Sequence, residues 1–442
     1  MRMRLWMLIA GAMVVTTADS FGEFEAPSLK WNGFASLREG QIVKGEPETI
    51  TKKQQPTDHV WVQEMNIGFG LETKFQQIPA TGNIGIEIAV VNDNSPYTGD
   101  FGTSRRLNFY PFLSRADLLF QLVDNGFLKL DLDLGYFPYK YNSSVRNLGE
   151  YLFRSGTYPQ YLITEIDFPL ARLMGGRLGV DIAEKFNFDL LVTTNTEWTA
   201  IGDVNLSGLL AWKPFPVFEI GLGGSWCSII TTDIDKITPQ VDGSRYLAKI
   251  PGTDSLAIYH YTFAGQKVMG RITLDPKQIL PWKDLFGKED LKLYAEAAIL
   301  GLIDYPVSMD GWTRYDSLWQ RIPVMGGFNL PTFGFMDVLS VEVEWFGNGY
   351  PNSLNTVRFD NQPIQLSSYG NEKDSIFLNV HDDDLKWSVY AKKTFKSNFF
   401  IMTQVARDHI RWFRLDYTAM DGKEALRKDD EWYYTFKLGY AF

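Results

Sequence analysis

The chain of 442 residues has few of the side chains from which metal sites and disulfide scaffolds are built. It contains one cysteine, Cys227, so no intramolecular disulfide can form, and it contains only four histidines. None of the histidines has metal-ligand spacing or lies in a recognisable Ser/His pattern for nucleophilic catalysis. The sequence therefore predicts no metal site, no cofactor and no enzymatic activity.

Basic stripes and long apolar runs are also scarce. The formal net charge is -10, with 43 Lys and Arg against 53 Asp and Glu, which argues against a nucleic-acid partner. Beyond the N-terminal segment there is no run of about 18 consecutive apolar residues, the length that a transmembrane helix needs. The sequence therefore predicts no membrane-spanning helix in the mature protein.

The N-terminal segment has the pattern of an export signal. Arg2 and Arg4 precede an apolar run from Leu5 to Val15, and small and polar residues follow through Ser20. This order is typical of a secretory signal peptide, and the apolar run is too short to span a bilayer as a helix. We expect residues 1–20 to be removed and residues 21–442 to form a single domain.

The opposite end of the chain, from Asp430 to Phe442, has the pattern of a strand with one apolar face. Large apolar side chains occupy every second position, and mostly small or polar ones lie between them. The apolar positions are Trp432, Tyr434, Phe436, Leu438, Tyr440 and Phe442. Aromatic residues at both ends of such a strand suit the two interfaces of a membrane. A buried edge strand of a soluble sandwich is the alternative interpretation.

In this strand the sequence resembles the outer-membrane β-barrel proteins of Gram-negative bacteria. The resemblance is carried by Tyr434, Phe436, Leu438, Tyr440 and Phe442. It implies that these residues form an assembly signal read by the barrel-insertion machinery, and that the protein lies among outer-membrane lipids. A closed barrel is the one structure other than a helix that satisfies every backbone group within a bilayer.

Further alternating segments recur along the chain. The clearest are residues 64–72, 84–90, 128–136 and 339–345. Weaker ones lie at residues 28–40, 115–123, 159–168, 178–196, 203–212, 216–229, 257–274, 290–303, 319–330, 384–395 and 398–408. With the last strand they predict an all-β fold, a transmembrane antiparallel up-and-down barrel of about sixteen strands. Counts of fourteen or eighteen stay open, because boundaries read in this way are uncertain by about two to four residues.

The connections between these segments alternate in length, as short periplasmic turns and long outer loops would. Short ones lie at residues 123–126, 213–216 and 396–398, and long ones at 41–58, 94–114, 137–158, 230–256, 347–383 and 409–429. Proline suits the first position of a helix. It therefore predicts helical turns in three further short connections, at residues 168–174, 275–280 and 330–336.

Charged residues recur in the polar halves of the strands. Facing lipid, an unpaired charge costs about 2 to 4 kcal/mol at mid-depth, so these side chains should point inward. The expected pore-lining residues are Glu64, Glu72, Lys129, Asp131, Asp133, Glu342 and Glu344. Acidic residues outnumber basic ones on this predicted wall, which favours a weak preference for cations. The alternative is that the charges only pair across strands.

The third outer loop, residues 137–160, carries basic and acidic residues among aromatic ones. In the porins that this chain resembles, the third outer loop folds into the barrel and narrows it. The resemblance therefore implies that Lys140, Arg146, Glu150 and Arg154 form a constriction. Arg146 and Arg154 would then oppose wall carboxylates such as Asp131 or Asp133. An ordinary surface loop packed on the rim is the alternative.

Two functions follow from these patterns. The first is a porin-like channel for passive diffusion of small hydrophilic solutes, for which the resemblance implies a homo-trimer as one possible assembly. The second is a non-conducting barrel that acts as a surface anchor or adhesin, or as a partner in an envelope assembly. Its outer loops would then bind polysaccharide or protein.

Overall fold

The computed structural model describes most of the chain. The described residues are 27–44, 61–76, 78–92, 107–154, 171–195, 202–232, 245–260, 263–303, 318–346, 385–396, 398–413, 420–424, 426 and 430–442. Within them, no helix is long and apolar enough to cross a membrane. The expected signal peptide, residues 1–20, and the expected strand at 159–168 lie outside the described residues and stay predictions.

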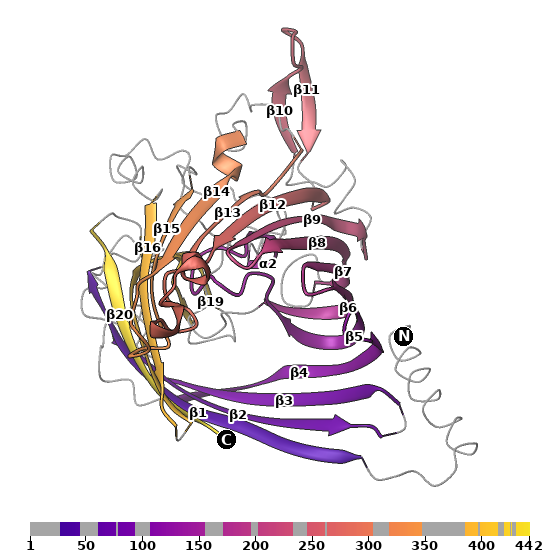
Figure 1. Ribbon diagram of the computed structural model, residues 1–442. Coiled ribbons are helices and arrows are strands. Elements are labelled where there is room, and N and C mark those ends of the chain that lie inside the picture. Colours follow the sequence, from indigo (N-terminus) through magenta and orange to yellow (C-terminus); the bar gives the residue numbers. More distant parts are fainter. Residues whose placement is uncertain are drawn as a thin grey trace.

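Strands that follow one another along the chain pair antiparallel, and the last returns to the first, so that the sheet closes (Figure 1). The barrel has sixteen strands. They are β1 (Ser28–Lys44), β2 (Trp61–Lys74), β3 (Ala80–Asn92), β4 (Leu107–Asp124), β5 (Leu128–Tyr139), β6 (Ala171–Ile182), β7 (Phe186–Thr194), β8 (Val204–Phe215), β9 (Phe218–Ile230), β12 (Gly265–Leu274), β13 (Leu293–Ile299), β14 (Pro323–Asn329), β15 (Val338–Phe346), β16 (Leu385–Thr394), β17 (Phe399–Arg407) and β20 (Trp432–Ala441). The predicted fold class and strand number are confirmed.

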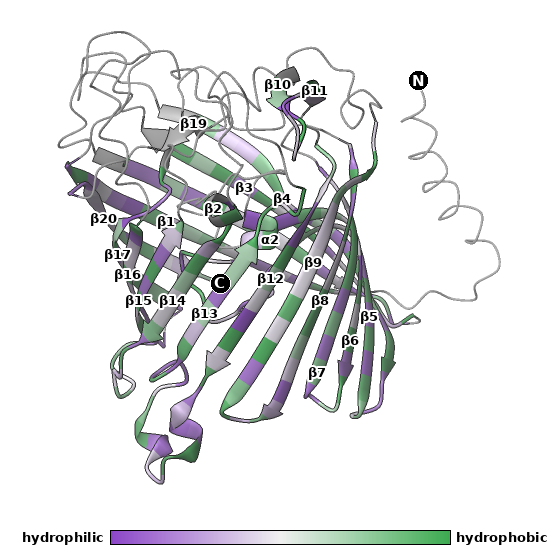
Figure 2. Ribbon diagram, turned by 90° about the horizontal axis from the view of Figure 1, so that it is seen from above, coloured by the Kyte–Doolittle hydropathy of each residue, from purple (hydrophilic) through white to green (hydrophobic). Residues whose placement is uncertain are grey.

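The two-residue period of β20 turns its aromatic side chains outward. Phe436, Tyr440 and Phe442 are 38%, 47% and 56% exposed, whereas Tyr433 and Thr435, at the alternate positions that precede Phe436, are buried. On the outer surface of a membrane barrel, such exposed apolar side chains meet lipid. Figure 2 shows the same alternation of hydrophilic and hydrophobic residues along the other barrel strands.

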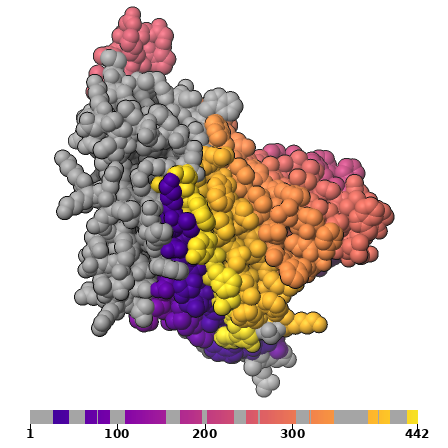
Figure 3. Space-filling model, turned by 90° about the vertical axis from the view of Figure 1, so that its left-hand side faces the viewer, coloured from indigo at the N-terminus to yellow at the C-terminus, as the bar shows by residue number. Residues whose placement is uncertain are grey.

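Closure of the barrel brings the two ends of the described chain together, so that β1 and β20 lie side by side in Figure 3. The backbone of Phe442 exchanges two hydrogen bonds of 2.9 Å with Gly33 in β1. A Cβ atom at Gly33 would lie 2.6 Å from the Phe442 ring, so the ring needs glycine at this place. The last residue is therefore part of the closing seam.

The connections alternate between two rims (Figure 2). One rim carries short turns at residues 75–79, 125–127, 183–185, 216–217, 330–337 and 395–398. On this rim residues 275–292 are longer and hold two 3-10 turns, η3 (Pro276–Ile279) and η4 (Lys283–Leu285). The described parts of the connections on the opposite rim include two hairpins and one 3-10 turn. The hairpins are β10 (Arg245–Lys249) with β11 (Leu256–His260) and β18 (Arg411–Phe413) with β19 (Met420–Glu424), and the turn is η5 (Leu318–Arg321).

Two expectations about individual strands were wrong. Residues 178–196 are not one strand, because a turn at 183–185 separates β6 from β7. That turn places Ala183 and Glu184 at positive φ, 56° and 57°, where asparagine or glycine is the usual signal. Residues 257–274 contain β11 of an outer hairpin as well as the barrel strand β12.

The helical turns expected from proline had mixed outcomes. Pro276 begins η3 at the short-turn rim, which confirms the turn expected at residues 275–280. For the turn expected at residues 168–174, the prediction was wrong at residues 171–174, because β6 begins at Ala171, and residues 168–170 lie outside the described residues. Residues 330–336 form non-helical turns.

Candidate functional site

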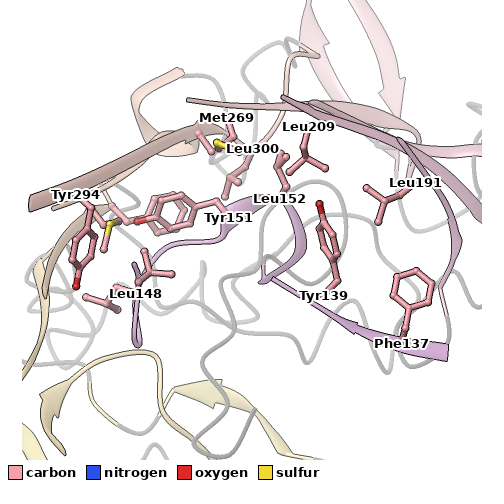
Figure 4. Close-up of a cluster of buried hydrophobic side chains, with 14 residues drawn as sticks. Phe137, Tyr139, Leu148, Tyr151, Leu152, Leu191, Leu209, Met269, Tyr294 and Leu300 are labelled. Carbon is pink, nitrogen blue, oxygen red and sulfur yellow. The ribbon is translucent and has the colours of Figure 1, made fainter. Parts of the chain in front are cut away.

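The loop after β5 folds into the barrel. We call residues 140–154 the inner loop; it includes the short helix α2 (Tyr151–Arg154), which contacts β9, β12 and β13. Leu148, Tyr151 and Leu152 of the loop are at most 3% exposed and belong to one apolar cluster with wall residues. Figure 4 shows them among Tyr294, Met269 and Leu209 of the wall. The interior of the barrel therefore has an apolar core on this side.

Two consecutive residues with positive φ bend the inner loop just before α2. Gly149 and Glu150 have φ of 96° and 58°. The backbone carbonyl of Glu150 accepts hydrogen bonds from the N–H groups of Phe153 (3.2 Å) and Arg154 (3.0 Å). Its carboxylate accepts the N–H of Asn142 at 2.8 Å. Glu150 thus holds the fold of the loop itself.

Glu342 of β15 is the main wall contact of the inner loop. Its carboxylate accepts the consecutive backbone N–H groups of Arg146 (2.6 Å), Asn147 (2.8 Å) and Leu148 (2.9 Å). The hydroxyl of Tyr294 donates to the same carboxylate at 2.8 Å. Glu342 is 1% exposed, and hydrogen bonds of this charge-assisted kind are about twice as strong as neutral ones.

Two further carboxylates of this wall, Glu296 and Glu344, accept hydrogen bonds from the inner loop. Glu296 of β13 accepts the Tyr141 hydroxyl (2.6 Å), the Asn142 side-chain amide (2.9 Å) and the Tyr151 N–H (3.0 Å). Glu344 of β15 accepts the Tyr151 hydroxyl at 2.8 Å. The loop is therefore docked through hydrogen bonds to strands far from β5, where it starts.

Asp408, which follows β17, extends this docking. It accepts the side-chain amide of Asn147 at 2.5 Å and the hydroxyl of Tyr433 at 2.7 Å. Next to it, His409 Nε2 lies 2.5 Å from Glu344. The inner loop thus reaches the wall on which the barrel closes.

The basic residues of the inner loop have other partners than the sequence suggested. Arg146 pairs with Glu289 at 2.6 Å, Arg154 donates to the Asn147 carbonyl, and Lys140 Nζ donates to the Val145 carbonyl at 2.7 Å. The expected pairing of Arg146 and Arg154 with Asp131 or Asp133 is wrong. The reason is that the loop crosses the lumen to the wall of β13 and β15, away from β5.

Neighbouring charges and burial act in opposite directions on the pKa of two carboxyl groups, Glu289 of the connection 275–292 and Glu150 of the inner loop. At Glu289 burial opposes ionisation, but the hydrogen bond and charge of Lys292 and the charge of Arg146 hold the pKa below its ordinary value. At Glu150 burial is dominant and raises the pKa to about 7, although Lys140 and the Asn142 N–H favour the carboxylate. Burial also lowers the pKa of the Lys140 ammonium. Burial therefore disfavours the charged forms of both the Lys140 and the Glu150 side chains.

The structure divides the residues expected to line the pore. Glu342 and Glu344 are 1% exposed and lie beneath the inner loop, where they hold the loop rather than face open space. Glu64 is paired with Arg38 at 3.4 Å, and Glu72 lies 3.6 Å from Lys74. On β5, Lys129 is exposed, Asp131 is partly exposed and Asp133 is buried.

Arginine–carboxylate pairs recur on strands β1 to β7, the wall from which the inner loop turns away. Besides Arg38 and Glu64, they are Arg115 with Asp117 (2.9 Å), Arg172 with Glu87 (3.4 Å) and Arg177 with Asp189 (2.8 Å). Sequence reasoning did not select Arg115, Asp117, Arg177 or Asp189. Alternation could have placed Arg115 and Asp117 on one face of β4, since they are two residues apart.

Comparisons with known proteins find similarity only to solved structures. No protein-family model and no curated protein matches the chain. Among solved structures, a triple mutant of the Rhodopseudomonas blastica porin is 9% identical, with a TM-score of 0.41, over 94% of this chain and 100% of that chain. Salmonella typhi OmpF in complex with daunomycin is 13% identical, with a TM-score of 0.44, over 94% of this chain and 98% of that chain. The closed sixteen-stranded barrel is established by the strand order of the chain itself.

Proposed function

We propose that the protein is an outer-membrane channel for passive diffusion of small hydrophilic solutes. The observation that supports this most strongly is the inner loop, docked on one wall of a closed sixteen-stranded barrel. Barrels of this strand number are wide enough to leave an aqueous lumen. Solutes would pass between the inner loop and the strands β1 to β7. The loop, with Lys140, Arg146, Glu150 and Arg154, would set the size limit.

A weak preference for cations is part of this proposal. The arginines of the β1 to β7 wall each have a carboxylate partner, which offsets part of their charge. Asp133 adds a further carboxylate there, and its buried Oδ1 has no hydrogen-bond partner among the described residues. We assign Glu64, Glu72, Lys129, Asp131 and Asp133 to the lining. The acidic excess among them would filter ions.

Assembly and location follow from the outward aromatic face of β20. Tyr434, Phe436, Leu438, Tyr440 and Phe442 would be read by the barrel-insertion machinery after export, and outer-membrane lipids would cover the apolar outer surface. Homo-trimer formation stays part of the proposal. Folded barrels of this kind migrate differently in detergent gels before and after boiling, which provides a check of folding for every variant below.

The test is single-channel conductance in a planar bilayer under a salt gradient. We expect stable open steps and a reversal potential whose sign indicates a preference for cations. The Asp133→Asn variant should have a smaller reversal potential. Asp254→Asn is the matched control, because Asp254 is fully exposed in the outer β10–β11 hairpin. An anion-selective reversal potential would reject the filter. Silence from folded protein would reject the channel.

One observation favours the second function, a non-conducting barrel that binds a partner through its outer loops. The β10–β11 hairpin projects from the barrel (Figure 1). It carries exposed apolar side chains, with Leu247, Leu256 and Ile258 at 43%, 47% and 62% exposure. Exposed apolar surface of this kind is common at binding sites. Folded protein that stays silent in bilayers and binds isolated envelope polysaccharide or protein through this hairpin would establish this function instead.

A further inference from the structure

A cavity of about 340 Å³ lies between the start of the inner loop and the wall of β6 to β9 and β12. Tyr139 and Lys140 line it from the loop side, and Arg177, Asp189 and Arg271 line it from the wall. Its volume falls within the range of about 300 to 1,000 Å³ that is usual for small-molecule sites. The residues of the inner loop that line it, Lys140 and Tyr141, precede those that dock on Glu342, Arg146 to Leu148.

Most of the charged side chains that line this cavity are basic. Three cationic side chains, Lys140, Arg177 and Arg271, line it together with one carboxylate, Asp189. The chain as a whole has a formal net charge of -10. An excess of cationic groups in an acidic protein indicates a local preference for anions.

The arginines are held in place, so the cavity is formed before a ligand arrives. Arg177 Nε and the Tyr139 hydroxyl both donate to Asp189, at 2.8 Å and 2.7 Å. Arg271 pairs with Glu219 at 2.6 Å, and only 7% of its side chain is exposed. Each guanidinium has five N–H donors in a fixed plane, so one carboxylate partner does not exhaust its capacity. A second anionic group can therefore be bound.

Two glycines make the space that the arginine side chains occupy. A Cβ atom at Gly179 of β6 would lie 2.7 Å from Arg177 Nη2. A Cβ atom at Gly221 of β9 would lie 2.6 Å from Arg271 Nε. Real Cβ contacts are not this short, so both arginines lie flat over glycine backbone. The absence of a side chain at Gly179 and Gly221 therefore leaves room for the two arginines of the cavity.

We propose that this cavity binds a small organic anion, a hydroxylated solute that carries a carboxylate or phosphate group. The anionic group would lie between Arg177 and Arg271, since guanidinium groups bind both anions in bidentate fashion. The Tyr139 hydroxyl and the Asn187 side chain, which also lines the cavity, would face the solute hydroxyls. The assignment rests on the proposed channel function, because it names the class of solute that the channel retains during passage.

The experiment is calorimetric titration of the folded protein in detergent with gluconate and with sorbitol. The two probes share a six-carbon hydroxylated skeleton and differ in the carboxylate. We expect gluconate to bind and sorbitol to bind at least about tenfold more weakly, as the loss of one charge-assisted contact predicts. Glucose 6-phosphate and glucose form a second pair, which tells whether phosphate replaces carboxylate at the site.

Three variants test the residues. Arg177→Gln and Arg271→Gln should each weaken gluconate binding by about tenfold, since each removes a guanidinium. Arg172→Gln is the matched control, because Arg172 lies on β6 like Arg177 and also pairs with a carboxylate, Glu87, but does not line the cavity. Asp189→Asn should tighten binding, because it removes the competing negative charge.

Equal affinity for each anion and its neutral analogue would overturn the inference. So would an equal loss of binding in Arg172→Gln and Arg177→Gln, or weaker binding in Asp189→Asn. A channel that conducts in bilayers without binding either anion would reject this cavity as a site and leave the proposed channel intact. Anion binding by a protein that is silent in bilayers would keep the site and reject the channel.

Discussion

The two walls of the barrel use the same residue types for different purposes. On β13 and β15, carboxylates at inward positions accept backbone N–H groups of the inner loop and are covered by it. On β1 to β7, carboxylates at inward positions pair with arginines of the wall itself. The difference shows that the route of one loop decides whether an inward carboxylate holds that loop or pairs within the wall.

The largest expected effect is the release of the inner loop by Glu342→Ala. The change leaves the N–H groups of Arg146, Asn147 and Leu148 without their acceptor. Unsatisfied buried donors cost about 1 to 3 kcal/mol each, so we expect the docked loop to lose about 3 kcal/mol or more. Hydrogen exchange of these three amides should accelerate by about a hundredfold.

The control for this variant is Glu64→Ala on the other wall. Glu64 is equally an inward carboxylate, but its partners are Arg38 and Asn66 rather than the loop. Exchange of the loop amides should stay unchanged in this control. Equal acceleration in both variants would mean that the two walls do not differ in the way described.

The next effect concerns pH. Burial raises the pKa of Glu150 from 4.5 to about 7, so docking of the loop is accompanied by proton uptake between these values. A carboxyl whose pKa is raised by docking stabilises the docked state at pH values below its ordinary pKa. This stabilisation is lost as the pH rises through the raised pKa. After correction for intrinsic exchange rates, loop amides should therefore be most protected below about pH 4.5 and least protected above about pH 7.

Glu150→Gln isolates this contribution. The glutamine carbonyl can still accept the Asn142 N–H but does not titrate in this range. Loop protection in this variant should vary less with pH than in the native protein, again after intrinsic rates are removed. An identical pH profile in both proteins would show that another group controls the docking.

A smaller effect is expected from Tyr151→Phe, which removes the hydroxyl that donates to Glu344. Loss of one hydrogen bond to a charged acceptor costs about 1.5 to 3 kcal/mol, but Glu344 keeps its contact with His409. Exchange of the α2 amides should accelerate by about tenfold. Tyr434→Phe is the control, because Tyr434 lies on β20 at one of the alternate positions expected to face outward. It should leave the exchange rates of the α2 amides unchanged.

Much of the barrel could be predicted from the sequence, because alternation is a local property of each strand. Phe436, Tyr440 and Phe442 point outward as their two-residue spacing requires. The turn between β6 and β7 was hidden because Ala183 and Glu184 adopt positive φ without a typical turn sequence. That error concealed the neighbourhood of Arg177 and Asp189, which lie on the two strands that the turn joins.

The inner loop shows where sequence reasoning fails. Loop order and resemblance predicted that residues near Arg146 would enter the barrel, but not which wall they would meet. That wall is decided by long-range contacts, such as the packing of Leu152 in the space above Gly223, where a Cβ atom would lie 2.8 Å from Leu152 Cδ1. Alternation likewise placed Glu342 inward without showing that a loop covers it. Contacts between distant segments leave no periodic signal in either segment.

The most direct test of the account is to compare single-channel conductance of the native protein and of Glu342→Ala in planar bilayers. The account predicts open steps from both proteins and larger steps from the variant, because release of the inner loop widens the lumen. Steps of the same size from both proteins, with loop exchange accelerated in the variant, would show that the loop does not narrow the path. Silence from both folded proteins would contradict the channel itself.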